Sequence, residues 1–232
     1  MIGIELFGYG KMGKVIEGIV NDTEGLVMAG IHDIDLDQET NAACDRVVVI
    51  DFSHKSFHHN AVEYALANGY ALVSGTTGLD EEQMAALREA GKTIPVCYST
   101  NYSYGVLALK RIIRAAAELL GDWDIELTET HHNQKVDAPS GTAKSVTEVL
   151  VDVTGKRAVM DRSGRREDDE IGVHAIRGGT IAGIHTVDFF GTEESISITH
   201  NAQSRRIFAE GAVKAAAKMT TELGFYTVDD IL

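Results

Sequence analysis

Apolar and polar positions along the first hundred residues predict strands that are separated by helices. Five short apolar runs are typical of strands, at residues 2–7, 26–31, 47–52, 70–74 and 94–98. Helical spacing of apolar residues lies between them, after residue 11 and over residues 57–66 and 80–90. Strands that alternate with helices form a parallel, doubly wound sheet. We therefore expect an α/β domain whose ligands bind at the carboxyl ends of the strands.

The pattern changes after residue 102. A long helix of about 18 residues is predicted from apolar spacing between residues 106 and 120. Residues 124–130 then alternate as a strand, which places Ile125, Leu127, Glu129 and His131 on one face. A helix over residues 143–151 follows, and residues 155–172 are typical of a polar loop rather than a lid. Three strands without intervening helices come next, at residues 173–176, 185–190 and 195–199.

An alanine-rich helix over residues 208–223 and a short tail close the chain. The second half therefore predicts a smaller α+β domain with a mixed sheet, beside a Rossmann-type parallel-sheet domain.

Net charge and cysteine content narrow the class of protein. The formal charge of −14 argues against a nucleic-acid surface or an anionic membrane as partner. No apolar run is long enough for a membrane span, and the N-terminus lacks the features of a signal peptide. Cys44 and Cys97 are too few for a disulfide framework. We expect a cytoplasmic protein, in which any pocket for an anion must be locally basic.

A glycine-rich motif lies between the first predicted strand and its helix. It reads Gly8, Tyr9, Gly10, Lys11, Met12 and Gly13, and Asp33 follows the second strand 20 residues later. This is the fingerprint of dinucleotide binding in its required context. Gly8 allows the tight turn, Gly10 lets the backbone approach a pyrophosphate, and Gly13 lets helix and strand pack closely. Asp33 can accept hydrogen bonds from ribose hydroxyls.

Small and hydroxyl residues follow two more of the predicted strands. We expect them to line the nicotinamide end of the same cofactor, with tight turns as the alternative explanation. They are Gly75, Thr76 and Thr77 after one strand, and Ser99, Thr100, Asn101 and Tyr102 after the other.

Residues 129–143 hold the densest group of chemically able side chains. His131 and His132 are adjacent, and Lys135 follows them. Residues 139–142 are typical of a helix start, which Ser140 or Thr142 can cap. A helix start favours a carboxylate or phosphate, and imidazole and ammonium groups can donate protons. The stretch predicts a pocket for an anionic small molecule beside proton donors.

His54, His58 and His59 form a second group of histidines. The spacing of His54 and His58 would allow a shared metal on a helix. No third ligand is evident nearby, so we favour a solvated helix start and expect no metal.

Residues 129–143 closely resemble the signature of the dihydrodipicolinate reductase family, now called 4-hydroxy-tetrahydrodipicolinate reductase. The resemblance covers nearly the whole chain. It includes residues 8–13, 50–52, 75–78, 101–105, 177–179, 183–186, 200–205 and 208–213.

The resemblance implies the reduction, by a nicotinamide cofactor, of a cyclic dicarboxylate in lysine and diaminopimelate synthesis. By position in the motif, His131 would be the general acid and Lys135 a second proton donor and carboxylate contact. His132, Gly141, Thr142 and Arg205 would also bind substrate. The family is typically a homotetramer that is built through the sheet of the second domain, and it closes by hinge motion. We therefore expect a dinucleotide-binding domain of residues 1–102 with 205–232, and a substrate-binding and tetramerisation domain of residues 103–204.

The chain departs from the common family pattern next to the acidic residue. Ile34 stands where many members have an arginine, which would meet a 2′-phosphate. Lys11 could partly replace that arginine, but Asp33 and Ile34 together favour NADH over NADPH.

Two other functions compete with this interpretation. A different two-domain Rossmann oxidoreductase would keep the glycine motif but would not need His131 and Lys135 before an anion-binding helix. A nucleotide sensor without turnover would not need these proton donors either. Both residues are present, which favours the reductase.

Overall fold

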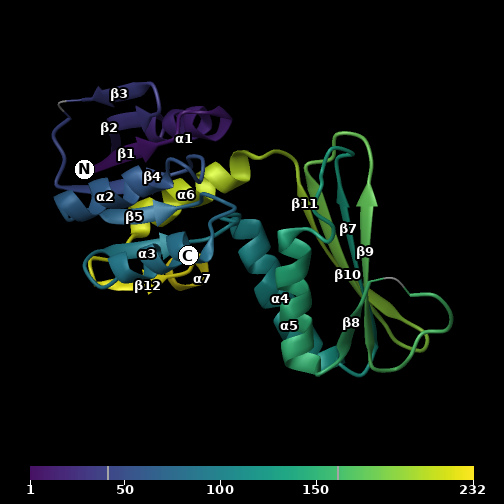
Figure 1. The fold of residues 1–232 in the computed structure, drawn as a ribbon. Coiled ribbons are helices and arrows are strands. Elements are labelled where there is room, and N and C mark those ends of the chain that lie inside the picture. Colours follow the sequence, from purple (N-terminus) through teal and green to yellow (C-terminus); the bar gives the residue numbers. More distant parts are fainter. Residues whose placement is uncertain (41, 161) are drawn as a thin grey trace. The chain divides into compact units, whose positions relative to one another are not determined.

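The computed structural model describes residues 1–40, 42–160 and 162–232, which form two compact units (Figure 1). Unit 1 comprises Met1–Tyr104 and Arg206–Leu232, and unit 2 comprises Gly105–Arg205. The sequence placed these boundaries after residues 102 and 204. None of the helices in this part of the chain combines the length and the apolar character that crossing a bilayer requires.

Unit 1 is built on a seven-stranded sheet in the order β12-β6-β5-β4-β1-β2-β3. All neighbouring strands are parallel except β2 and β3, which are antiparallel. The expected Rossmann-type sheet is therefore confirmed. Its strands are β1 (Ile2–Phe7), β2 (Leu26–Asp33), β3 (Leu36–Glu39), β4 (Arg46–Asp51), β5 (Ala71–Ser74), β6 (Pro95–Tyr98) and β12 (Gly224–Tyr226).

Helices cover both faces of this sheet and bury a separate apolar cluster on each. On one face, Ile16 and Val20 of the first helix pack with Ala212 and Ala216 of the sixth. On the other face, Ala61 and Leu87 belong to a second buried cluster. The helices of unit 1 are α1 (Lys11–Asn21), α2 (His58–Asn68), α3 (Glu81–Ala90), α6 (Arg206–Lys218) and α7 (Val228–Ile231).

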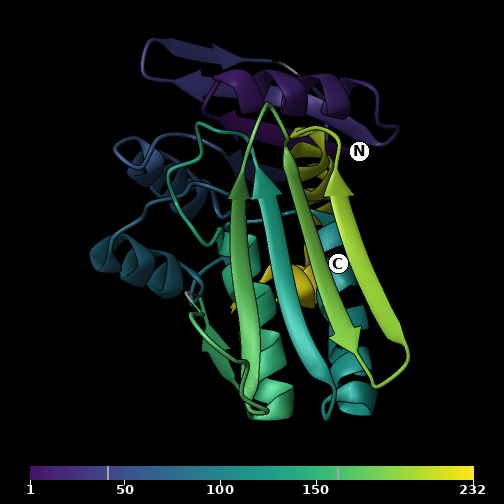
Figure 2. The same cartoon turned by 90° about the vertical axis from the view of Figure 1, so that its right-hand side faces the viewer.

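Unit 2 contains a five-stranded mixed sheet in the order β11-β10-β7-β9-β8. The three strands β7, β9 and β8 are parallel, whereas β10 is antiparallel to both of its neighbours. The expected mixed sheet is confirmed. The strands are β7 (Asp124–His131), β8 (Arg157–Val159), β9 (Glu170–Arg177), β10 (Gly183–Phe190) and β11 (Ser195–Ala202). Helices α4 (Tyr104–Leu120) and α5 (Gly141–Thr154) lie together on one face of the sheet (Figure 2).

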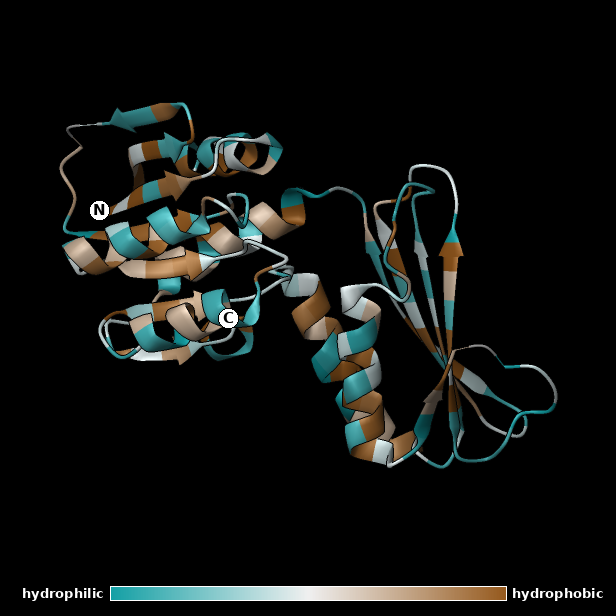
Figure 3. Ribbon diagram, viewed as in Figure 1, coloured by the Kyte–Doolittle hydropathy of each residue, from teal (hydrophilic) through white to brown (hydrophobic). Residues whose placement is uncertain are grey.

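The alternation along β7 decides what lies beneath those helices. Ile125, Leu127, Glu129 and His131 are all buried, as the period of two predicts. Ile125 and Leu127 join the apolar cluster that α4 and α5 cover. Hydrophobic residues run along the strands and form stripes on these helices (Figure 3). Because Glu129 and His131 continue the same face, two polar side chains are carried into the interior at the end of the strand.

Three segments differ from the sequence prediction. Strand β3 was missed because its acidic residues are unusual in strands, although they suit an exposed edge. Helix α6 ends at Lys218 rather than residue 223, and β12 instead joins the sheet beside β6. Two threonines after the helix have low helix propensity.

The segment predicted as a solvated loop over residues 155–172 is partly a strand. Strand β8 lies inside it and pairs with β9, which begins at Glu170. Arg162 and Arg166 pair with Glu126 of β7, and Arg162 also lies 3.2 Å from Glu170. These ion pairs bind the segment to the sheet, so it is not a plain solvated loop. Residue 161 lies outside the described residues.

Candidate functional site

The glycine motif forms the turn between β1 and α1 in unit 1. Gly8 has a φ of 93°, a conformation that side chains rarely adopt. A Cβ atom on Gly13 would lie 2.1 Å from the carbonyl oxygen of Gly8, whereas one on Gly10 would meet nothing within 4 Å. Gly13 is therefore required by the packing of the turn itself. Gly10 has no such constraint and leaves its backbone open to a ligand.

Asp33, at the end of β2, is hydrogen-bonded to this turn. Its Oδ2 accepts from the backbone N–H of Tyr9 at 2.7 Å, and its Oδ1 accepts from Ile34 N–H at 2.9 Å. A hollow of about 470 Å³ beside Asp33 is also lined by Phe7, Leu36 and residues of α2. The glycine turn and the acidic residue thus lie together at the ends of β1 and β2. This arrangement fits the pyrophosphate and ribose of a dinucleotide.

A buried histidine braces β2 directly behind Asp33. His32 Nε2 lies 2.9 Å from Glu5 Oε2, and its Nδ1 lies 2.6 Å from Asp37 Oδ1. Burial lowers the pKa of His32, but the hydrogen bonds and charges of the two carboxylates outweigh it and raise the pKa above its ordinary value. This group holds the end of β2 against β1 and β3.

Asp51 forms a buried hydrogen-bond centre at the end of β4. Its Oδ2 accepts from Ser74 Oγ and from Thr76 Oγ1, both at 2.9 Å, and lies 2.6 Å from His58 Nδ1. Ser53 Oγ donates to Oδ1 at 2.6 Å. The side chain of Asp51 therefore ties the ends of β4 and β5 to the start of α2. His58 is buried against this carboxylate, so the start of α2 is not solvated at His58 as the sequence predicted.

The residues that follow β5 and β6 divide into internal and outward-facing ones. Thr76 is buried, and the side chain of Tyr102 is 1% exposed, with its hydroxyl donating to Ser74 O at 2.8 Å. Any contact of these two residues with a cofactor would therefore involve their backbone. Thr77 and Thr100 are exposed.

Two further residues predicted at this edge are fixed within the turns. Ser99 Oγ accepts from Asn101 N–H at 3.1 Å and donates to Asn101 O at 2.8 Å. A Cβ atom on Gly75 would come within 2.4 Å of the Phe52 ring, so close packing requires the glycine.

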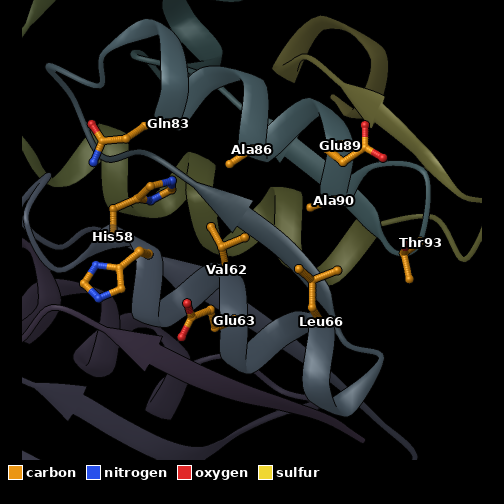
Figure 4. A pocket seen from close by; sticks show the side chains of 10 residues that line it. His58, Val62, Glu63, Leu66, Gln83, Ala86, Glu89, Ala90 and Thr93 are labelled. Carbon is orange, nitrogen blue, oxygen red and sulfur yellow. The ribbon is translucent and has the colours of Figure 1, made fainter.

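A second hollow, of about 370 Å³, lies between α2 and α3 (Figure 4). His58 and Gln83 stand at one end of it, and Leu66 and Thr93 stand at the other. None of the residues predicted to bind the cofactor is among the described residues that line it. We assign it no role in the site.

In unit 2, His131 lies at the end of β7 with its Nδ1 hydrogen-bonded to Glu129 Oε2. The other oxygen, Oε1, accepts from Arg177 Nη2 at 2.8 Å and from Ser140 N–H at 3.1 Å. Burial raises the pKa of Glu129, but its bonds to Arg177, His131 and Ser140 outweigh burial and lower it. Burial lowers the pKa of His131, and the charges of Lys135 and Arg177 act in the same direction.

His185, on the neighbouring strand β10, packs against this group. Its ring meets that of His131 edge-on with 5.2 Å between the centroids, and its Nε2 lies 3.1 Å from Ser140 Oγ. Burial lowers the pKa of His185 to about 4, so the ring is neutral at pH 7. Ligand atoms of Glu129, His131 and His185 lie within 4.8 Å of one another, a spacing that also suits a metal. We favour a hydrogen-bonded group instead, because these side chains bond to one another, to Ser140 and to Arg177.

The start of α5 lies beside this group. Ser140, rather than Thr142, is the N-cap, because its Oγ accepts from Ala143 N–H at 3.1 Å. A Cβ atom on Gly141 would meet nothing within 4 Å, so the helix start is open to a ligand. The first N–H groups of the helix and its dipole favour an anion there, where Gly141 and Thr142 stand.

The remaining predicted substrate contacts surround the same segment. Lys135 Nζ forms an ion pair with Asp137 Oδ1 at 2.7 Å, and its backbone N–H donates to His132 O at 3.1 Å. Arg205 Nη2 lies 3.4 Å from His132 Nε2. Unit 2 therefore brings its predicted substrate residues to one end of the sheet, next to the start of α5.

Sequence reasoning missed several members of this group. Glu129 shares a face with His131, and that alternation was the available signal. Arg177 is the register partner of His131 on β9. His185 lies opposite Glu129 on β10. Predicting the positions of Arg177 and His185 would have required the strand pairing, which depends on the order of strands in the sheet.

Comparisons with known proteins point to one family over nearly the whole chain. Family models described as "Dihydrodipicolinate reductase, N-terminus" and "Dihydrodipicolinate reductase, C-terminus" match residues 2–102 and 105–232. A protein of Staphylococcus haemolyticus named 4-hydroxy-tetrahydrodipicolinate reductase is 41% identical over 244 aligned positions, covering 98% of this chain and 99% of that one. Its namesake in Staphylococcus aureus is 47% identical over 192 positions, covering 81% and 79%.

Solved structures show the same fold. The dipicolinate-bound dihydrodipicolinate reductase of Paenisporosarcina sp. TG-14 matches with a TM-score of 0.79 at 22% identity, and the match covers 100% of both chains. A diaminopimelate dehydrogenase of C. glutamicum matches with a TM-score of 0.56 at 15% identity, covering 100% of this chain and 94% of that one.

Proposed function

The chain belongs to the dihydrodipicolinate reductase family, and we propose that it catalyses the NAD(P)H-dependent reduction of 4-hydroxy-tetrahydrodipicolinate in lysine and diaminopimelate synthesis. The observation that carries the proposal within this chain is the buried imidazole of His131, which lies beside the open start of α5. A proton donor next to an anion-binding helix start is what a dicarboxylate that accepts a hydride and a proton needs.

Unit 1 supplies the cofactor site in this proposal. Gly10 leaves the backbone open for the pyrophosphate, and Asp33 accepts hydrogen bonds from the ribose. Gly75, Thr77, Ser99 and the segment 100–102 lie at the strand ends where the nicotinamide is expected. When it is bound, the nicotinamide supplies the hydride.

Unit 2 holds the substrate and supplies the proton. Gly141 and Thr142 bind one carboxylate at the start of α5, while His132 and Arg205 contact the substrate. His131 donates the proton from Nε2, because Nδ1 faces Glu129. Lys135, which Asp137 holds at 2.7 Å, serves as a carboxylate contact and a second donor.

The test of this function is cofactor consumption. The preceding synthase generates the substrate freshly from pyruvate and aspartate semialdehyde, and loss of NADH absorbance is followed with and without this chain. His131→Gln should reduce kcat by about 10²-fold or more, since general acids contribute that much. His59→Gln, an exposed histidine on α2, is the matched control and should retain full activity.

Two results would contradict the proposal in different ways. Turnover by His131→Gln within threefold of wild type would show that His131 is not the acid. No consumption by the wild type while NADH still binds would favour the sensor or a different oxidoreductase.

We further propose that NADH is preferred over NADPH. The position next to Asp33 holds Ile34, whose side chain is 70% exposed and carries no charge for a 2′-phosphate. Asp35 and Asp37 add negative charge to the same segment. Ile34→Arg should raise kcat/KM for NADPH, whereas Ile34→Met, which adds length without charge, should not. A wild-type kcat/KM for NADPH more than tenfold above that for NADH would refute the preference.

We also propose a homotetramer that is built through the sheet of unit 2. Helices α4 and α5 cover one face of that sheet, and the described chain places no helix on the other face (Figure 2). That face carries Ile176 and Phe190, which are 50% and 43% exposed. Sedimentation should give four times the 25.1 kDa chain mass, and a monomer at micromolar concentration would contradict the proposal.

A further inference from the structure

Glu129 contacts three residues of the unit 2 site, although the sequence predicted no role for it. It is fully buried, and its two oxygens meet His131, Arg177 and Ser140, which come from β7, β9 and the start of α5. We propose that Glu129 is the positioning residue of this enzyme: it fixes which nitrogen of His131 donates the proton, and it ties that imidazole to the helix start that binds the substrate carboxylate. The inference rests on the proposed function and deepens it.

The hydrogen-bond partner decides the tautomer of His131. An ionised carboxylate can only accept, so Nδ1 must carry a hydrogen toward Glu129. The proton for the substrate must then come from Nε2. During the reaction the Nε2–H bond breaks, the charged ring becomes neutral, and the Nδ1–H bond to Glu129 persists. Solvent restores the proton on Nε2 after turnover.

Gly183 leaves room on the Nε2 side of this imidazole. It begins β10, and a Cβ atom at this position would lie 3.0 Å from His131 Nε2 and 3.4 Å from Cδ2. Any larger residue would crowd the nitrogen that Glu129 leaves for donation. Two independent features, a carboxylate at Nδ1 and a missing side chain near Nε2, therefore assign the same direction of proton transfer.

The second oxygen of Glu129 links the acid to the binding helix. Oε1 accepts from Ser140 N–H, and Ser140 caps α5 through its Oγ. The same Oγ lies 3.1 Å from Nε2 of the neutral His185. Arg177 completes the set with its bond to Oε1 and balances the buried charge. A shift of Glu129 would thus move both the proton donor and the carboxylate site.

The charges around His131 predict how it responds to the loss of Glu129. Lys135, Arg177 and His185 surround it from the loop, β9 and β10, and burial together with Lys135 and Arg177 lowers its pKa. Glu129 opposes them by stabilising the imidazolium. Because donation requires the protonated ring, activity falls as pH rises through the pKa of His131. Removing the charge of Glu129 should move this fall to lower pH.

The experiment compares Glu129→Gln with Glu126→Gln in the full chain. Glu126 is the matched control: it lies on the same strand, three residues away, and it also pairs with an arginine and a histidine, Arg162 and His174. Activity is measured from pH 5 to pH 9, NADH affinity by titration, and the His131 ring by nitrogen NMR. We expect Glu129→Gln to lower kcat about 10²-fold and to move the high-pH limb down by about one unit or more. NADH affinity should stay unchanged.

Glu126→Gln should lose stability but keep both the pH profile and the His131 spectrum. If Glu129→Gln does not fold, Glu129→Asp keeps the charge on a shorter side chain; it should hold the pH limb near wild type while lowering kcat. The inference would be overturned if the high-pH limb of Glu129→Gln activity lay within 0.3 pH units of wild type and the His131 ring kept the same tautomer. The NMR titration does not need turnover, so a wild type without reductase activity would refute the proposed function while still testing Glu129.

Discussion

The glycine turn of unit 1 allows a packing requirement to be separated from a ligand requirement. Gly10→Ala and Gly13→Ala add the same methyl group, three residues apart, at the start of α1. A Cβ atom at position 13 would lie 2.1 Å from Gly8 O, more than an ångström short of ordinary contact. At position 10 it would meet nothing within 4 Å. The first change should therefore damage the fold, and the second should damage only binding.

The size of each effect follows from these contacts. Overpacking a tight site costs about 1–3 kcal/mol, and for a chain of this length each kcal/mol lowers Tm by about 2–4 °C. Gly13→Ala should therefore lower Tm by roughly 2 to 12 °C and weaken NADH binding, because Gly8 must move. Gly10→Ala should change the free energy of unfolding by less than about 1 kcal/mol. It should weaken NADH binding at least tenfold, or about 1.4 kcal/mol, since the methyl group would occupy the path proposed for the pyrophosphate.

Two measurements on the same samples separate the outcomes. Thermal unfolding without cofactor reports the packing term, and calorimetric titration with NADH reports binding. Wild-type affinity in Gly10→Ala would show that the pyrophosphate does not approach this backbone. An unchanged Tm in Gly13→Ala would refute the argument that helix and strand require a glycine there.

Three further predictions concern the two strand-end groups. Gly183→Ala should lower kcat/KM at least tenfold by crowding His131 Nε2, whereas Gly178→Ala, where the added methyl group has open space, should not. Equal kcat/KM values for the two variants would show that His131 does not need the space that Gly183 leaves. Asp51→Asn should lower the free energy of unfolding by about 2–4 kcal/mol in urea titrations, because an amide cannot accept from every donor that the carboxylate binds. A decrease in this free energy of less than about 0.5 kcal/mol would contradict the prediction. The pKa of His185 is lowered to about 4 because the folded state favours the neutral ring. The contribution of this ring to stability is therefore complete above pH 6.5 and is lost as pH falls toward 4. Between pH 6.5 and 5 the wild type should lose on the order of 1–2 kcal/mol more than His185→Gln, and parallel curves would refute the assignment.

Local patterns in the sequence were sufficient for most of the fold. Apolar runs separated by helical spacing predicted the parallel sheet, alternation with a period of two predicted β7, and the capping residues and composition predicted α5. The same signals failed for β3, β8 and β12. These are short edge strands that bury few apolar side chains, so their pairing depends on the neighbouring strand rather than on their own pattern.

The candidate site was predictable where its residues lie close together along the chain. His131, Lys135 and Gly141 fall within eleven residues, and the motif they form was visible directly. Arg177 and His185 reach the same place because β9 and β10 flank β7 in the sheet. The sequence of neither strand predicts this order. Tyr102 shows the opposite limit: the motif placed it near a cofactor, but a large ring with a hydroxyl can also serve the core, and here it does.

A chain with a formal charge of −14 must still bind an anionic cofactor and a dicarboxylate, and the structure indicates how. Three acidic residues at the two candidate sites are occupied by the chain's own donors. Asp33 accepts two backbone N–H groups, Asp51 accepts hydroxyl and imidazole donors, and Glu129 is matched by Arg177. Each is thereby kept from repelling a ligand at short range, while the open helix start at Gly141 remains available to a carboxylate. On this argument, local pairing at the strand ends, rather than net charge, decides where this acidic protein can hold an anion.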